Sequence, residues 1–160
     1  MLDTSGAGLH KRGYRKNSNE APIKETLAAV MAKLSRVRTD GTLIDPFCGS
    51  GTILIEGAML AMHIAPGLRR HFAAEKWKAV PGNIWDNEHI AAKALERRDE
   101  GFLAFGYDID PEAVRLTLEN AKKRELRSIS PQKCATSRIS ANGPARSAAS
   151  SATRRTASGF

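Results

Sequence analysis

The segment Leu43-Ile-Asp-Pro-Phe-Cys-Gly-Ser-Gly-Thr-Ile-Leu-Ile-Glu56 joins an apolar run to two closely spaced glycines and then to a second apolar run. The residues at 42–44, which follow Gly41, predict a short buried strand, and those at 52–63 predict a helix. Gly49 and Gly51 permit a tight turn at which the backbone can approach a ligand closely. The segment therefore predicts a strand, a glycine loop and a helix whose free N–H groups face a nucleotide-like ligand.

Three kinds of ligand suit such a loop. A phosphate-binding P-loop requires a Gly-Lys-Ser/Thr ending, but no lysine follows Gly51. A dinucleotide-binding loop requires a third glycine, where Leu54 stands, and an acid further on, whereas residues 61–68 contain none. In the third interpretation the acid, Asp45, precedes the glycines. An ordinary strand-to-helix turn would explain a lone Gly-x-Gly, but the string from Asp45 to Thr52 is far more specific.

Asp45-Pro-Phe-Cys-Gly-Ser-Gly-Thr52 resembles the first motif of class I S-adenosylmethionine-dependent methyltransferases. The resemblance implies that the acid lies near the amino-acid part of the cofactor and that the glycines allow close approach. The implied cofactor is S-adenosyl-L-methionine. The residues implied to contact it are Asp45, Phe47, Cys48, Gly49, Ser50 and Gly51, among which Cys48 is expected to be a small packing residue.

A second segment, Gly101-Phe-Leu-Ala-Phe-Gly-Tyr-Asp-Ile-Asp-Pro-Glu-Ala-Val114, repeats the pattern of apolar strand, acidic turn and helix. Asp110 followed by Pro111 is typical of a helix start. The resemblance implies that Asp108, at the strand end, accepts hydrogen bonds from two ribose hydroxyls, with Ile109 beside it in the cofactor site. The alternative, in which both aspartates only cap the helix, suits Asp110 better than Asp108.

The fold expected from these segments is α/β, a Rossmann-like class I methyltransferase fold with a doubly wound sheet, of which only the N-terminal part is present. Two strands of an expected seven are recognised, near residues 42–44 and 102–107. Helices are expected over residues 22–36, 52–63, 87–98 and 111–123. The first of these has apolar residues at three- and four-residue spacings, namely Ile23, Leu27, Val30, Met31 and Leu34.

Several further motifs narrow the resemblance. They are Leu9-His-Lys-Arg-Gly-Tyr-Arg15, Ala21-Pro-Ile-Lys-Glu-Thr-Leu-Ala28 and an insertion that begins Ile64-Ala-Pro-Gly-Leu-Arg-Arg-His-Phe. Between about residues 2 and 123 the chain resembles the bacterial 23S rRNA guanine-N2 methyltransferases, whose members carry an RNA-binding THUMP domain ahead of the catalytic domain. This implies 23S rRNA as partner. Residues 1–20 would form a basic junction to a missing THUMP region, and residues 21–123 a partial methyltransferase domain.

The junction supplies the candidate RNA contacts. Arg12, Arg15 and Lys16 are expected to touch RNA phosphates, although a solvated basic loop would have the same composition. In the insertion, Trp77 and Trp85 are expected to be packing anchors rather than platforms on which bases stack.

Residues 124–160 differ from the rest of the chain. They are rich in Ser, Ala and Arg, contain few large apolar residues and have no acid after Glu125, so a disordered tail is expected. The whole chain carries a net charge of +8. The tail holds seven Lys or Arg and one Glu, a net +6, which leaves +2 for residues 1–123. Charge therefore does not itself indicate RNA binding, which rests on the resemblance.

A shift of reading frame would explain the tail. If Thr153–Phe160 is written ACC CGC CGT ACG GCG AGC GGC TTT after a codon ending in A, the frame one base earlier encodes Asn-Pro-Pro-Tyr-Gly-Glu-Arg-Leu. Asn-Pro-Pro-Tyr is the catalytic motif of the family that the chain resembles. The same slip converts Cys134–Ser140 into Arg-Asp-Val-Ala-Asp-Phe, which resembles the acidic motif near the cofactor's adenine. A frameshifted tail without the catalytic loop is the interpretation that we favour.

The expected function is that of a fragment of an S-adenosylmethionine-dependent RNA methyltransferase for guanine N2 of 23S rRNA, inactive as written. Alternatives are a fragment of an adenine-N6 or protein-glutamine methyltransferase, a noncatalytic remnant, or a chain whose basic tail binds RNA. The two cysteines and four histidines have no metal-ligand spacing. No apolar run reaches membrane-spanning length. Neither a metal nor a membrane is expected, and the expected location is the cytoplasm.

Overall fold

The computed structural model describes residues 2–15, 23–98 and 101–133. In chain order the elements are α1 (Glu25–Leu34), β1 (Thr42–Asp45), α2 (Thr52–Ala61), the 3-10 helix η1 (Ala73–Lys76), α3 (Gly82–Ala94), β2 (Leu103–Asp108), α4 (Pro111–Lys123) and β3 (Ile129–Lys133). Strands alternate with helices along the chain, so the predicted α/β class is confirmed for the described residues.

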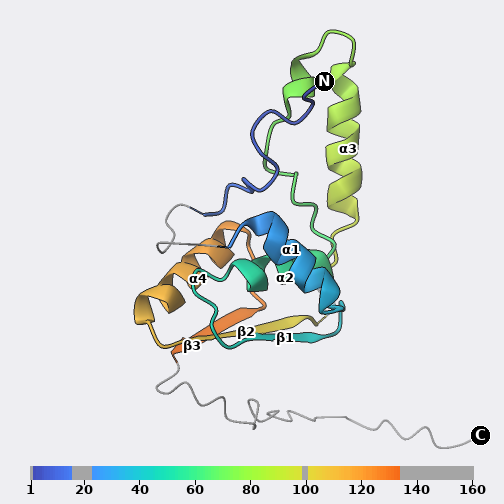
Figure 1. Ribbon diagram of the computed structural model, residues 1–160. Helices are drawn as coiled ribbons and strands as arrows, with labels where there is room; N and C mark the ends of the chain where they lie inside the picture. The colour runs from blue at the N-terminus through green and yellow to red at the C-terminus, as the bar shows by residue number, and fades with distance from the viewer. Residues whose placement is uncertain (1, 16–22, 99–100, 134–160) are drawn as a thin grey trace, which may run out of the picture.

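The three strands form one parallel sheet in which β2 lies between β1 and β3. Thr42 pairs with Leu103, and Asp45 pairs with Gly106, so β1 and β2 end side by side. The helices α1, α2 and α4 lie on one face of this sheet (Figure 1). In such sheets ligands bind outside the carboxyl ends of the strands, which draws attention to the loops that follow β1 and β2.

The core lies between the sheet and α2. Leu54, Ile55 and Ala58 of α2 are fully buried, and Ala104 of β2 is fully buried beneath them. Eight of the ten residues of α2 are buried, because α1 covers it on one side and the sheet on the other. Burial of each large aliphatic side chain stabilises the fold by roughly 1.5–3 kcal/mol. This core fixes the direction in which the loop before α2 leaves the sheet.

The helix predicted over residues 22–36 is shorter in the structure, and it packs through a different face from the one that its apolar spacing marks. α1 runs over Glu25–Leu34 and buries Ala28 and Ala32 against α2. The apolar side chains of Leu27, Val30 and Leu34 are exposed instead. Small residues allow two helices to approach closely, so the alanine face makes the contact with α2.

The prediction of disorder from residue 124 onward is wrong for residues 124–133. β3 occupies Ile129–Lys133 and pairs with β2 along its whole length. Leu126 and Ile129 are buried in the core, and the side chain of Arg124 is buried as well. Pro131 lacks an N–H group; among the described strands β3 has a neighbour on one side only, and a strand in that position tolerates proline. The part of the predicted tail at residues 134–160 lies outside the described residues.

The insertion between α2 and β2 packs against the N-terminal segment. Arg70 donates hydrogen bonds to the carbonyl oxygens of Ser5 and Gly8, at 3.0 and 3.3 Å. Trp85 of α3 stacks on Phe72 with ring centroids 5.7 Å apart, which confirms its predicted role as a packing anchor. α3 spans Gly82–Ala94 rather than the predicted 87–98, and none of its residues is buried.

Candidate functional site

The candidate site is the loop that joins β1 to α2, at the carboxyl end of the sheet. Gly49 and Gly51 both have positive φ, at 52° and 78°. The N–H of Gly51 donates to the carbonyl oxygen of Cys48 at 2.7 Å, which closes the turn, and Gly51 is also the N-cap of α2. No side chain caps this helix start. The first N–H groups of α2 are therefore available to a ligand with acceptor atoms.

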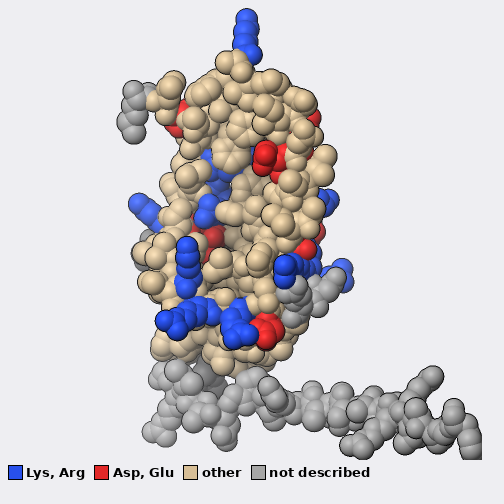
Figure 2. Space-filling view, turned by 90° about the vertical axis from the view of Figure 1, so that its right-hand side faces the viewer, with Lys and Arg blue, Asp and Glu red and all other residues tan. Residues whose placement is uncertain are grey.

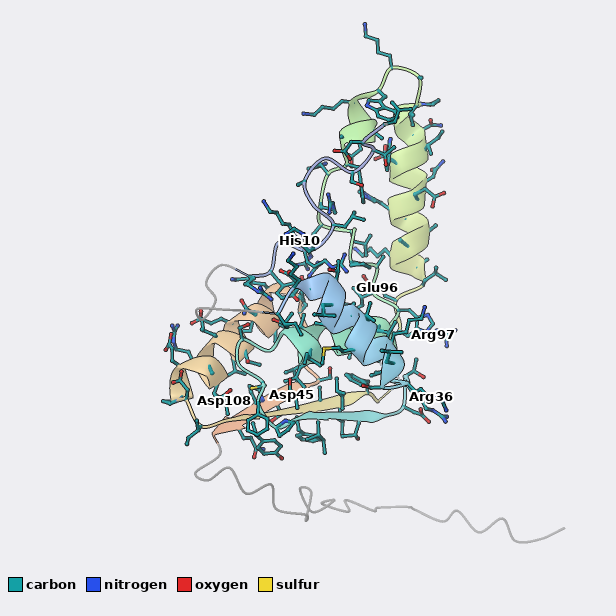
Figure 3. All side chains as sticks on the ribbon, viewed as in Figure 1. His10, Arg36, Asp45, Glu96, Arg97 and Asp108 are labelled. Carbon is teal, nitrogen blue, oxygen red and sulfur yellow. The ribbon has the colours of Figure 1, made fainter. Side chains whose placement is uncertain are left out.

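Two carboxylates lie at this edge of the sheet. Asp45 ends β1 and Asp108 ends β2, and the two lie together at one end of the sheet, opposite the end that carries Arg36 (Figure 3). One oxygen of Asp108 accepts the N–H of Gly49 at 2.9 Å, and the other accepts the N–H of Asp110 at 3.0 Å. Asp108 thus links the end of β2 directly to the glycine loop. A residue whose only role was to cap α4 would not make this contact.

Asp45 is nearly buried, and its carboxylate accepts the N–H of Phe47 at 3.1 Å. Burial raises the pKa of Asp45 above its usual value, the Phe47 hydrogen bond lowers it and the negative charge of Asp108 adds to the rise. A cation placed beside such a carboxylate would stabilise its charged form. The sequence-predicted residues Asp45, Gly49, Gly51 and Asp108 are therefore brought together.

Cys48 and Ser50 lie on the inner side of the loop, whereas Phe47 and Ile109 lie on its outer side. Burial raises the pKa of the Cys48 thiol to about 11, so the thiol stays protonated at neutral pH and is a packing residue rather than a nucleophile. Phe47 and Ile109 are 72% and 68% exposed. Two apolar side chains thus flank the carboxylates and are open to contact a ligand.

The candidate RNA residues Arg12 and Arg15 are turned into the domain. The guanidinium of Arg12 pairs with Glu56 of α2 at 3.5 Å, and that of Arg15 pairs with Glu25 at 3.8 Å. Arg15 also donates to the hydroxyl of Thr52, the first residue of α2, at 2.7 Å. Both arginines therefore hold the junction segment against the helices of the domain, Arg12 against α2 and Arg15 against α1 and α2. RNA contact by them stays a prediction, and Lys16 lies outside the described residues.

Sequence reasoning missed the centre of this network. Tyr14 is buried and donates its hydroxyl hydrogen to Glu56 at 3.0 Å, and the Arg124 guanidinium lies 5.7 Å from the Tyr14 ring centroid. Burial raises the pKa of Tyr14 far above its usual value, and that of Glu56 is raised as well. One signal could have revealed it: Glu56 is the single acid in the otherwise uncharged run of α2, and a buried carboxylate needs partners.

Other possible sites lie elsewhere or lack the required residues. A cavity of about 690 Å³ is lined by residues such as Val37 and His63, and another of about 830 Å³ by Leu118 and Ile129. Neither includes a residue of the loop at 45–51. Within residues 2–15, 23–98 and 101–133, no group of three His, Cys, Asp or Glu is placed to hold a metal ion. No helix in these ranges could cross a membrane.

Figure 2 shows most Lys and Arg side chains of this face in its lower half, in several groups with acidic side chains among them. This agrees with the small net charge of residues 1–123. The surface charge on this face therefore adds no argument for nucleic acid.

A parallel sheet with an open glycine loop after β1 and an aspartate at the end of β2 is the arrangement expected of the class I methyltransferase fold. Comparison with known proteins identifies the family. Residues 12–144 match the model of UPF0020, an RMKL-like methyltransferase domain. The chain belongs to this family.

Curated relatives agree with this assignment. The chain is 43% identical over 125 residues to "Putative RNA methyltransferase YpsC" of Bacillus subtilis, a match that covers 78% of this chain and 32% of YpsC. It is 43% identical over 137 residues to the ribosomal RNA large subunit methyltransferase K/L of Methylococcus capsulatus, covering 79% of this chain and 18% of that protein. The chain thus spans a third or less of the length of these relatives.

Solved structures agree as well. SMU.472, described as a putative methyltransferase complexed with SAH, is 38% identical with a TM-score of 0.78, over 84% of this chain and 35% of its own. A protein from Listeria monocytogenes described as a predicted N6-adenine-specific DNA methylase is 41% identical, with the same TM-score, over 82% of this chain and 35% of its own. The predicted class I methyltransferase fold is therefore confirmed.

The loop geometry predicts unequal effects for two glycine-to-alanine variants. An added Cβ at Gly51 would lie 2.6 Å from the methyl of Thr117, whereas nothing lies within 4 Å of the Cβ position at Gly49. Both variants incur the cost of a positive φ, roughly 1–2 kcal/mol. Gly51→Ala adds a packing clash of about 1–3 kcal/mol. We expect Gly51→Ala to lower the free energy of unfolding by about 2–5 kcal/mol in urea titrations, and Gly49→Ala by distinctly less. Equal losses would contradict this.

Proposed function

We propose that this chain forms the cofactor-binding part of an S-adenosylmethionine-dependent RNA methyltransferase that acts on guanine N2 of 23S rRNA. The observation that carries the proposal is the open loop at residues 45–51, with the carboxylates of Asp45 and Asp108 beside it. The bound SAH described for SMU.472 and the name of the Methylococcus relative support cofactor and substrate class respectively. A cytoplasmic location follows from such a substrate.

The residues of the site suit the parts of this cofactor. Asp45, whose charged form is disfavoured by burial, would pair with the cofactor's ammonium group. Each carboxylate oxygen of Asp108 accepts one backbone N–H, from Gly49 or from Asp110, and has a second lone pair. These second lone pairs would accept hydrogen bonds from the ribose hydroxyls. The exposed side chains of Phe47 and Ile109 would cover apolar parts of the ligand. When bound, the cofactor supplies an activated methyl group.

The experiment is titration of the complete 160-residue chain with SAH by isothermal calorimetry. We expect saturable binding, and at 100 times the dissociation constant about 2.7 kcal/mol of stabilisation against urea. We also expect no methyl transfer from S-adenosylmethionine to 23S rRNA, because the sequence contains no Asn-Pro-Pro-Tyr. Absence of both heat and stabilisation would overturn the cofactor assignment. Methyl transfer by the pure chain would overturn the inactivity.

The one-base slip stays a prediction, since the residues that it concerns lie outside those described. Sequencing the gene from the codon of Asn120 past that of Phe160 decides the matter. An indel before Cys134 with Asn-Pro-Pro-Tyr in the neighbouring frame would support it, and one intact frame without that peptide would refute it.

A second target, adenine N6, is favoured by the name of the Listeria protein. Nucleoside mass spectrometry of 23S rRNA and of DNA, each incubated with a frame-restored enzyme, separates the two. N2-methylguanosine in the RNA supports the first target, and N6-methylated adenine in either nucleic acid supports the second.

A further inference from the structure

The inner face of α4 holds the glycine loop through two polar side chains. Thr117 and Asn120 are three residues apart, so they lie on the same face of the helix, and they are 0% and 2% exposed. The Thr117 hydroxyl donates to the carbonyl oxygen of Gly49 at 2.9 Å. The Asn120 amide donates to the carbonyl oxygen of Ser50 at 3.1 Å. Two consecutive carbonyl groups of the loop therefore point toward α4.

The direction of a carbonyl fixes the direction of the N–H group in the same peptide unit. The described backbone contains no cis peptide bond, and in a trans peptide the two groups point in opposite directions. Because the Gly49 carbonyl points inward to Thr117, the N–H of Ser50 points away from Thr117 and α4. Thr117 thus determines the orientation of a donor without touching the ligand itself.

Thr117 also limits how the loop can approach α4. Its methyl group fills the place that a side chain at Gly51 would need, and its hydroxyl lies 3.7 Å from the sulfur of Cys48. The contacts of this single side chain therefore reach Cys48, Gly49 and Gly51. A buried hydroxyl needs a hydrogen-bond partner, and the partner here is the loop itself.

We propose that Thr117 is a positioning residue for the cofactor loop, supported by Asn120, and that it orients the Ser50 N–H toward the ligand. The proposal rests on the proposed function, because the ligand is taken to be S-adenosylmethionine or its product SAH. α4 follows Asp108 directly along the chain, so Thr117 and Asn120 link the loop after β1 to the end of β2 that carries Asp108.

The test compares Thr117→Val, which keeps the side-chain shape but loses the hydroxyl, with Thr117→Ser, which keeps the hydroxyl. Leu116→Val is the matched control, since Leu116 is a buried neighbour on α4 whose side chain cannot form a hydrogen bond to the loop. SAH dissociation constants are measured by calorimetry on complete chains that circular dichroism shows to be folded. The loss of one hydrogen bond predicts a dissociation constant about 3–10-fold higher for Thr117→Val. Thr117→Ser and Leu116→Val should stay within about twofold of the wild type.

Each outcome decides something. A Thr117→Val chain that binds SAH as tightly as the wild type overturns the proposal while leaving the proposed function intact. Equal losses for Thr117→Val and Thr117→Ser, or for Thr117→Val and Leu116→Val, also overturn it, because packing alone would then set affinity. A wild-type chain that does not bind SAH overturns the proposed function and this proposal with it. Selective loss in Thr117→Val that the serine restores supports it.

Discussion

Glu56→Ala is expected to lower the free energy of unfolding by about 3–5 kcal/mol, because it removes the buried carboxylate that pairs with the largely enclosed Arg12 and accepts the Tyr14 hydroxyl hydrogen. The carboxylate of Glu56 lies 3.5 Å from the Arg12 guanidinium and accepts the Tyr14 hydroxyl hydrogen at 3.0 Å. The side chain of Arg12 is 11% exposed and that of Glu56 is 3% exposed. Water can therefore replace little of the lost charge. The measurement is urea unfolding followed by circular dichroism.

The chain contains a matched control for this variant. Glu112 pairs with Arg115 on the outer surface of α4, where both side chains are more than half exposed. Glu112→Ala removes a carboxylate from an ion pair in the same way, but water solvates the remaining arginine, so stability should change little. Similar losses for Glu56→Ala and Glu112→Ala would contradict the structural role assigned to the buried network.

The same residue gives a pH dependence. Burial raises the pKa of Glu56 above its usual 4.5, and the nearby Arg12 only partly opposes this rise. A carboxyl group with a raised pKa in the folded state stabilises that state most below pH 4.5, and this contribution is lost as the pH rises through the raised value. The Glu56→Gln variant has no titratable group at this position, so it serves as the reference. The stability of the wild type relative to Glu56→Gln should therefore fall as the pH rises above 4.5, and a difference that grows with pH would contradict the assignment.

Local signals explain which parts of the fold could be predicted. The glycine loop, the strand before it and the Asp110-Pro111 start of α4 depend on backbone preferences of a few neighbouring residues, and the structure has them where the sequence places them. The side chain of Asp110 accepts the N–H of Glu112 at 2.9 Å, as a helix cap does. Elements with this kind of signal were located to within one or two residues.

Long-range packing explains what could not be predicted. The apolar spacing of α1 predicts a helix but does not say which face packs, and the alanine face meets α2. β3 has only one large aliphatic residue, and pairing with β2 rather than its own composition holds it in the sheet. Tyr14 and Glu56 are 42 residues apart, so their contact leaves no periodic pattern in the sequence. In the candidate site, Thr117 and Gly49 are 68 residues apart, so the hydrogen bond between them leaves no local pattern in the sequence either.

Asp108→Ala is expected to raise the SAH dissociation constant at least about 100-fold, provided that the carboxylate accepts the ribose hydroxyls as proposed. Two hydrogen bonds to a charged acceptor contribute about 1.5–3 kcal/mol each, and 1.4 kcal/mol corresponds to a tenfold change in affinity. The variant also frees the N–H of Gly49, which Asp108 accepts at 2.9 Å. Calorimetric titration of the complete, folded chain measures the effect.

Asp110→Ala is the matched control, two residues further along the chain. The substitution removes the carboxylate that accepts the N–H of Glu112 at the start of α4, and it should lower the free energy of unfolding by about 1 kcal/mol. Because the Asp110 carboxylate bonds to the start of α4 and not to the loop at 45–51, the SAH dissociation constant should stay within about twofold of the wild type. If the two variants bind SAH equally well, Asp108 has no ribose role and serves, like Asp110, to hold the start of α4 in place.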